Sequence, residues 1–271
     1  MIAEFLADID TNVQAELKTP VEIVDCAEFP KISELYLITR RWKRVRDVVV
    51  VSADMDGSTR LNFDKYAPTS ASLFEAATGN MVKIVEAFNP DFVDIQGDGL
   101  FAIYHGDKRY ERAFCAAETL RTFSEKVLMP RIEELMAERF PRTGLKVGMA
   151  AGILVVKKVG VRGKAQEPIW AGKPVAWAVK AAEAAEVNTV MVTKAVYNRL
   201  GENDYIAWSC GCSTGVPTKL WSQATVDALP DDEGVECHIL RSAWCETCGD
   251  MFCQAILEGE KRRSDLPSVA A

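Results

Sequence analysis

Two aspartates, each at the end of a predicted strand, carry the clearest chemistry in this sequence. Asp54 closes the β-branched run Val48–Val51, which is typical of a strand buried on both faces. Asp98 lies in a Gly-Asp turn between the predicted strands Asp91–Gln96 and Leu100–Tyr104. If these strands are neighbours, the two carboxylates meet at one rim of a sheet, where their repulsion favours a divalent cation between them. Oxygen ligands favour Mg²⁺ or Mn²⁺, and two such ions can clamp the attacking and leaving oxygens of a phosphoryl transfer.

The residues just after Asp54 fit a phosphate-binding turn. Gly57 lets the backbone come close to a ligand, and exposed N–H groups with the hydroxyls of Ser58 and Thr59 can hold phosphate oxygens. Ser58 or Thr59 would serve equally well as the N-cap of a following helix, and taken alone the cap is the better interpretation.

The elements that must position these residues predict an α+β sandwich. Helices are predicted at about 1–17, 33–41, 70–88, 110–139, 174–186 and 193–199, and strands at 48–51, 91–96, 100–104, 146–157 and 189–192. This order favours an antiparallel-rich sheet covered by helices. The basic run at 40–44 is interpreted as a solvated joint, and residues 204–271 are expected to be irregular.

Four segments resemble the motifs of class III nucleotide cyclases, and they occur in the order of that family. Residues 52–61 (SADMDGSTRL) resemble F-x-D-I-x-G-F-T-x-L, and residues 94–102 (DIQGDGLFA) resemble the K-x-x-G-D-a-x-x-A hairpin. Residues 144–152 (GLKVGMAAG) are similar to R-x-G-I-H-x-G, and residues 170–180 (WAGKPVAWAVK) to W-G-x-x-V-N-x-A-x-R. The resemblance implies the ferredoxin-like sandwich of these enzymes.

The resemblance also implies a division of the chain. It covers about residues 46–200, which we expect to be the catalytic domain. Residues 1–45 would be a helical N-terminal extension, and residues 201–271 a segment rich in Cys and Trp.

The matches and departures imply roles for single residues. Asp54 and Asp98 would be the metal carboxylates, with the Met55 carbonyl as a third ligand. Lys180 stands where the family has an Arg that holds the triphosphate, and Ala176 stands where it has an Asn that orients the ribose. Because both metal carboxylates remain, we expect an active enzyme rather than an inactive one.

The departures resemble the bacterial pyrimidine nucleotide cyclases of the Pycsar anti-phage systems, which make cyclic UMP or cyclic CMP for a separate effector protein. Asp94 replaces the purine-reading Lys or Glu of other class III cyclases. Strand alternation puts Ser52 on the face of Asp54, and Asp94 and Gln96 on the face of Asp98, as candidate base-pocket residues. Their hydrogen-bonding groups suit uracil or cytosine. The preference for uracil over cytosine in this hypothesis rests on the resemblance.

The leading hypothesis is therefore a uridylate cyclase that converts UTP to 3′,5′-cyclic UMP and pyrophosphate with two Mn²⁺ or Mg²⁺ ions per site. The alternatives are a cytidylate cyclase acting on CTP and a catalytically inactive nucleotide-binding regulator. The general base is Asp54 or a metal-bound water. In the resembling family each site is shared across a head-to-tail homodimer, so Lys180 would reach the site of the other chain.

The cysteines suggest a second metal site. Six of the eight follow position 209. Cys210, Cys212, Cys245 and Cys248 have spacings that suit a structural, tetrahedral Zn²⁺. Buried thiols in a Trp-rich setting are an equal alternative.

Composition narrows the partners. With 32 Lys and Arg against 39 Asp and Glu, the net charge is -7, which argues against a nucleic-acid partner. The sequence starts without the pattern of a signal peptide and holds no apolar run long enough to span a membrane. We therefore expect a cytoplasmic protein with no membrane partner.

Overall fold

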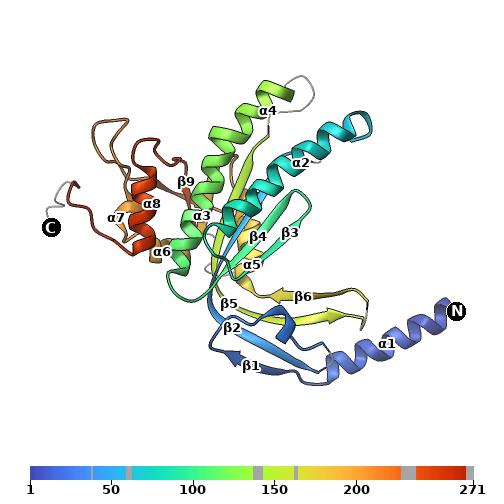
Figure 1. The fold of residues 1–271 in the computed structure, drawn as a ribbon. Coiled ribbons are helices and arrows are strands. Elements are labelled where there is room, and N and C mark those ends of the chain that lie inside the picture. Colours follow the sequence, from blue (N-terminus) through green and yellow to red (C-terminus); the bar gives the residue numbers. More distant parts are fainter. Residues whose placement is uncertain (38, 59–62, 137–142, 162–163, 227–235, 267–271) are drawn as a thin grey trace. The chain divides into compact units, whose positions relative to one another are not determined.

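The computed structural model describes residues 1–37, 39–58, 63–136, 143–161, 164–226 and 236–266. They form a nine-stranded mixed sheet with helices, which confirms the predicted α+β class (Figure 1). The helices are α1 (Ile2–Lys18), α2 (Phe63–Glu86), α3 (Arg109–Phe123), α4 (Met129–Met136), α5 (Lys173–Ala184), α6 (Lys194–Leu200), α7 (Asp204–Ala207) and α8 (Gly249–Glu258). The strands are β1 (Glu22–Cys26), β2 (Arg41–Met55), β3 (Phe92–Gln96), β4 (Gly99–Tyr104), β5 (Leu145–Gly160), β6 (Gln166–Ala171), β7 (Thr189–Thr193), β8 (Trp221–Thr225) and β9 (Glu236–Leu240).

The chain forms two compact units. The smaller comprises residues 1–46 and 154–171, and the larger comprises residues 47–153 and 172–271. The division expected at 45/46 and 200/201 stays a prediction. In the part of the chain that the structure describes, no helix is long and apolar enough to cross a membrane.

In the smaller unit, β1 runs parallel to the start of β2, and β6 is antiparallel to the end of β5. The rings of Phe29 and Trp170 stack with centroids 5.2 Å apart. The predicted N-terminal helix is confirmed as α1, and every one of its residues is exposed to solvent.

The core of the larger unit lies between the sheet and helices α2 and α3. Alternate residues of β2, among them Val49 and Val51, pack in one cluster with Leu73 of α2 and Leu120 of α3. The whole run Val48–Val51 is 0% exposed, which confirms a strand buried on both faces. The strand order β3-β4-β2-β5-β7-β9-β8 places β2 beside both β4 and β5.

Two predictions near the N-terminus are wrong. The expected helix at 33–41 is a short 3₁₀ turn at Ile32–Glu34, after which β2 begins at Arg41. The basic run at 40–44 is largely strand rather than a solvated joint, because acidic residues of β1 face it in register. Arg41 lies opposite Glu22 and Arg44 opposite Asp25, and each pair forms an ion pair at 2.6 Å.

The C-terminal prediction is also wrong, since residues 204–266 contain α7, β8, β9 and α8. Strand β9 pairs with β7, and β8 pairs with β9, so this segment widens the sheet. The long helix predicted at 110–139 is divided instead, because a π-helical turn at Ser124–Leu128 separates α3 from α4.

Helix α5 packs directly on strand β5 at Gly148. A Cβ at this position would lie 2.1 Å from the carbonyl oxygen of Ala178 and 2.4 Å from the amide nitrogen of Ala182. Both are backbone atoms, so only a shift of the whole helix could relieve the overlap. Gly148 therefore sets the distance between α5 and the sheet.

We predict that Gly148→Ala lowers the free energy of unfolding by roughly 2–3 kcal/mol, because the added methyl group overpacks this contact. Urea unfolding followed by circular dichroism measures the effect. Gly79→Ala is the matched control. Gly79 lies in α2, where a Cβ meets nothing within 4 Å, and the change should stabilise the helix by up to about 1 kcal/mol. Equal stability of Gly148→Ala and the wild type would contradict the prediction.

Candidate active site

The register of three neighbouring strands brings the candidate residues onto one face of the sheet. Ser52 of β2 lies opposite Phe101 of β4, and Phe101 lies opposite Asp94 of β3. Directly opposed residues point to the same side of a sheet, and so do residues two apart on one strand. Asp54 and Gln96 therefore share the face of Ser52 and Asp94, which confirms that Ser52 lies on the face of Asp54 and that Asp94 and Gln96 lie on one face. Asp98 lies in the turn between the strands, so its predicted place on that face stays a prediction.

The β3–β4 turn brings Asp98 toward the end of β2. Gln96 pairs with Gly99, so Gly97 and Asp98 form a two-residue hairpin turn. Gly97 has a φ of +66°, the left-handed conformation that such turns require. A Cβ at Gly99 would lie 2.8 Å from the Ala53 carbonyl oxygen and 2.9 Å from Asp54 Oδ1. The missing side chain at Gly99 thus lets the hairpin close onto Asp54.

The surroundings of Asp54 disfavour its charged form. Burial first, and the negative charge of Asp98 second, raise the pKa of Asp54 above its usual value. A backbone hydrogen bond from Met55 and the positive charge of Lys146 oppose that rise. The two aspartates are therefore close enough for their charges to interact.

Lys146 is a site residue that the sequence reasoning missed. Its Nζ lies 3.2 Å from Asp56 Oδ1 and donates a hydrogen bond of 3.3 Å to the Glu183 carbonyl. The positive charge of Lys146, which acts on Asp54, is thus already shared with Asp56. A lysine in the first part of β5, where the other residues up to Val156 are apolar or glycine, was the available signal, but its acidic neighbours lie on other elements.

The donor set fits a divalent cation. Asp54 and Asp98 offer carboxylate oxygens, the ligands that Mg²⁺ and Mn²⁺ prefer. A cation would also relieve the repulsion that raises the pKa of Asp54. The side chain of Met55 is 1% exposed and lies in the core, so only the backbone of Met55 could contribute a ligand.

The loop after β2 is fixed at its first residue. The Asp56 N–H donates to the Gly144 carbonyl at 2.9 Å, and the Asp56 carbonyl accepts from the Thr143 hydroxyl. Gly57 follows with a φ of +71°, and Ser58 is half-buried. Thr59, the third predicted phosphate contact, lies outside the described residues.

The base-pocket candidates differ in their accessibility. Ser52 is only 5% exposed. Asp94 is half-buried and Gln96 is exposed, and Gln96 Nε2 donates a hydrogen bond of 3.1 Å to Asp94 Oδ2. Asp94 and Gln96 thus form one exposed polar pair at the edge of the sheet.

Lys180 lies on the outer side of α5. Ala178, Ala181 and Ala182 are the buried residues around it, whereas Ala176 and Lys180 are exposed. The Lys180 ammonium pairs with Glu183 at 2.7 Å, rather than with either aspartate. This side of the helix is free to face a second molecule.

The four predicted zinc ligands come together elsewhere in the larger unit. The sulfur atoms of Cys210, Cys212, Cys245 and Cys248 all lie within 4.8 Å of one another. They belong to loops beside β8 and β9, at the opposite end of the strand order from β3 and β4. The two groups of candidate residues are therefore separate sites.

Comparison with known proteins identifies similar chains. The chain is 45% identical over 263 residues to a uridylate cyclase of Micromonospora echinofusca, covering 96% of this chain and 86% of that protein. It is 41% identical to a uridylate cyclase of Propioniciclava tarda, over 84% of this chain and 74% of that protein. No protein-family model matches the chain.

A solved structure shares the fold. The adenylyl cyclase CyaB of P. aeruginosa superposes with a TM-score of 0.58 at 16% identity, over 83% of this chain and 99% of that chain. The expected class III cyclase fold is thereby confirmed.

We predict that Asp54→Asn stabilises the metal-free protein at neutral pH. The folded-state pKa of Asp54 is raised, so its protonated form stabilises the fold fully below the ordinary pKa of 3.8. That stabilisation is lost as the pH rises through the raised pKa. The neutral amide should therefore increase the melting temperature at pH 7, and the increase should vanish at about pH 3.5.

The exposed Asp107 provides the control, since Asp107→Asn should leave the melting temperature unchanged at both pH values. Added Mn²⁺ should stabilise the wild type and not Asp54→Asn. Thermal unfolding with and without Mn²⁺ measures both effects. A lower melting temperature for metal-free Asp54→Asn at pH 7 would refute the electrostatic account.

Proposed function

This chain belongs to the uridylate cyclase family, and we propose that it converts UTP to 3′,5′-cyclic UMP and pyrophosphate. The observation that carries the proposal is that Asp98, in the β3–β4 turn, lies close enough to Asp54, at the end of β2, for their charges to interact. The chain that holds this pair is 45% identical to a uridylate cyclase. In this reaction the ribose 3′-oxygen bonds to the α-phosphorus. The bond from the α-phosphorus to its bridging oxygen breaks, and pyrophosphate leaves.

Asp54, Asp98 and the Met55 carbonyl would hold two Mg²⁺ or Mn²⁺ ions. Bound there, the ions would lower the pKa of the 3′-hydroxyl and neutralise the charge that develops on the phosphate. The 3′-hydroxyl gives its proton to Asp54 or to an ordered water.

The polyphosphate would be held from two sides. The left-handed Gly57 exposes the backbone next to Ser58, whose N–H and hydroxyl can donate to phosphate oxygens. Lys180 of a second chain would supply positive charge after leaving Glu183. An exposed ion pair of this kind is worth no more than about 1 kcal/mol, so opening it is easy. Each homodimer would then contain two shared sites.

Asp94 and Gln96 are the proposed readers of the base. The Asp94 carboxylate can accept from uracil N3–H, while the Gln96 amide can donate to one carbonyl oxygen and accept elsewhere. The same carboxylate can accept from cytosine N4, so CTP is the alternative substrate. The hydrogen bond between Asp94 and Gln96 makes the pair act as a unit, since a base that engages one of them alters the other.

The product would be a second messenger. We infer that cyclic UMP made in the cytoplasm activates a separate effector protein during anti-phage defence. This part of the proposal rests on the resemblance to the pyrimidine cyclases of such systems.

A nucleotide-binding regulator without turnover is the second candidate. Ala176 favours it, because a methyl group on the exposed side of α5 has no polar atom to orient a ribose. The retained pair of Asp54 and Asp98 favours the enzyme, since binding alone needs no carboxylates that repel each other.

We predict that the purified chain with Mn²⁺ converts UTP faster than CTP, ATP or GTP, with cyclic UMP identified by mass spectrometry. Asp54→Ala and Asp98→Ala should each lower the rate at least about 100-fold, because each removes charge that holds the catalytic cations. Asp107→Ala makes the same chemical change at an exposed position outside the site and should keep full activity.

If the chain converts only ATP or GTP, the assignment to the pyrimidine nucleotide cyclases is wrong. Faster turnover of CTP would favour the cytidylate alternative. Tight nucleotide binding without any product at millimolar Mn²⁺ would favour the regulator.

We also predict that two inactive variants complement each other. Asp54→Ala and Lys180→Ala should each be weakly active alone. In their mixed dimer, one site receives both substitutions and the other receives neither. Random mixing should therefore restore about one quarter of the wild-type rate. Mixing Asp54→Ala with Asp98→Ala is the control and should restore nothing, because both changes damage the same half of every site. Absence of rescue in the first mixture would contradict shared sites.

A further inference from the structure

Two loops of the C-terminal segment bring four cysteines to one point. Their sulfur atoms all lie within 4.8 Å of one another, and those of Cys212 and Cys248 are 3.7 Å apart. A Zn–S distance of about 2.3 Å gives a regular tetrahedron an S···S edge of about 3.8 Å. A disulfide would need about 2.05 Å. The distance between Cys212 and Cys248 is therefore that of two ligands of one metal ion and is too long for a disulfide.

We propose that Cys210, Cys212, Cys245 and Cys248 bind one structural Zn²⁺. Four thiolates complete the tetrahedral coordination of Zn²⁺ and leave no open position for a substrate or water. The soft sulfur ligands also set this site apart from the hard oxygen ligands of Asp54 and Asp98. The zinc has a structural role.

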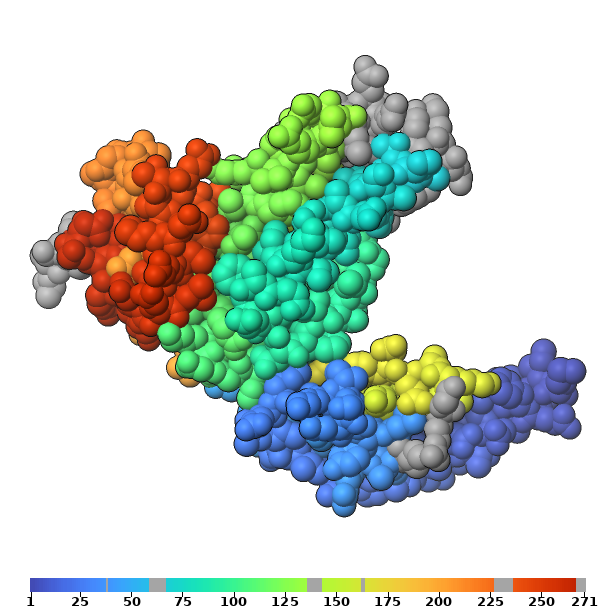
Figure 2. Space-filling view, viewed as in Figure 1, coloured from blue at the N-terminus to red at the C-terminus, as the bar shows by residue number. Residues whose placement is uncertain are grey.

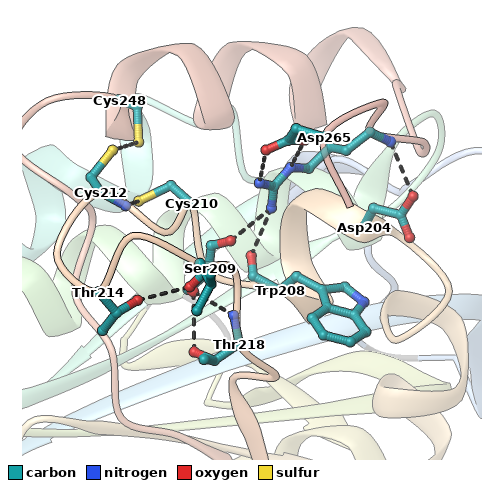
Figure 3. Close-up of polar contacts among 11 residues, drawn as sticks. Asp204, Trp208, Ser209, Cys210, Cys212, Thr214, Thr218, Cys248 and Asp265 are labelled. Carbon is teal, nitrogen blue, oxygen red and sulfur yellow. Dashed lines mark hydrogen bonds and ion pairs between the residues drawn. The ribbon is translucent and has the colours of Figure 1, made fainter. Parts of the chain in front are cut away.

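The first loop is built to present Cys210 and Cys212 together. Gly211 between them has a φ of +78°, and a Cβ there would lie 2.9 Å from the Val216 carbonyl carbon. The Cys212 N–H points at the Cys210 sulfur at 3.5 Å (Figure 3). An N–H donated to sulfur stabilises the thiolate that a metal requires.

The base of this loop is closed independently of the cysteines. The Ser209 N–H donates to the Thr218 carbonyl at 2.8 Å, and the Thr218 N–H donates to the Ser209 hydroxyl at 2.8 Å (Figure 3). The guanidinium of Arg263 donates to the carbonyls of Trp208 and Ser209 and pairs with Asp265. The loop is thus held in shape, with both sulfurs directed toward the second pair.

The second loop lies at the beginning of helix α8. The Gly249 N–H donates to the Cys245 carbonyl at 2.7 Å and closes the Cys-x-x-Cys turn. Backbone N–H groups of Thr247 and Cys248 hydrogen-bond to the Cys245 sulfur. The positive end of the helix favours thiolates at this place as well.

The zinc would tie the first loop to a helix that covers the core. Trp244 precedes the second loop, and its indole N–H donates to Thr119 of α3 at 3.0 Å. Its ring meets Phe114 of α3 edge-on, with centroids 6.1 Å apart. Figure 2 shows the C-terminal residues in orange and red gathered beside green residues of the larger unit. Zinc would therefore stabilise the packing of the second loop against α3. In the sheet, β5 and β7 separate the C-terminal strands β8 and β9 from β2, which carries Asp54.

The test uses the full chain, purified without chelators, with zinc measured by mass spectrometry and protein by absorbance. We expect about one Zn²⁺ per chain. Cys248→Ser should reduce the zinc content at least fivefold and lower the melting temperature. Cys26→Ser is the matched control, because Cys26 is equally half-buried but lies in β1 of the smaller unit, and it should keep the metal.

Replacement by Co²⁺ provides a second readout, since four thiolates around Co²⁺ give intense sulfur-to-metal absorption bands. If Cys248→Ser does not fold, zinc is removed from the wild type with a thiol-reactive mercurial and a chelator instead. A lower melting temperature after zinc removal, restored to the original value by added Zn²⁺, would support the proposal.

Three results would overturn it. These are equal zinc in Cys248→Ser and Cys26→Ser, iron in place of zinc, and disulfides at these four positions.

Discussion

The carboxylates of Asp54 and Asp98 repel each other, yet the end of β2 and the β3–β4 turn have to hold them close together. Much of the larger unit can be understood from that requirement. Burial and the charge of Asp98 both raise the pKa of Asp54, so the metal-free site is electrostatically unfavourable. The pairing of β2 with β4 and of β4 with β3 prevents the chain from relaxing. The buried cluster beneath β2 and β4, against α2 and α3, stabilises that arrangement.

The same sheet also determines what can approach the site. Gly148 allows α5 to lie against β5, which buries one side of the helix and leaves Ala176 and Lys180 exposed on the other. A helix packed this way cannot turn Lys180 inward without losing its contact with the sheet. The proposed sharing of sites between two chains agrees with this orientation, because Ala176 and Lys180 lie on the exposed side of α5.

Local patterns predicted the parts of the fold that depend on local interactions. Val48–Val51 is a run of β-branched residues, and Gly97-Asp98 is a hairpin turn, so both were visible in the sequence. Strand β1 was missed and the basic run was misjudged, because Glu22 and Arg41 become neighbours only when two strands pair in parallel. The strands at the C-terminus were missed for the same reason, since β9 is stabilised by β7.

The candidate sites show the same limit. Strand alternation correctly placed Ser52 with Asp54 and Asp94 with Gln96, but it could not show that Ser52 is buried while Gln96 is exposed. Lys146 escaped notice because its partners belong to other elements. The spacing of the cysteines indicated two pairs, whereas the folding of the 32 residues between Cys212 and Cys245 decides whether the pairs meet.

Gly99 has a consequence for how such an enzyme could evolve. Alanine scanning reveals what a side chain contributes by removing it, and at position 99 there is nothing to remove, although Asp54 depends on that empty space. Asp94 lies on β3, two residues before Gln96, which is the residue directly opposite Gly99. Selection could therefore vary Asp94 while position 99 stays fixed. Substrate preference could drift within the family without disturbing the apparatus that handles the phosphate.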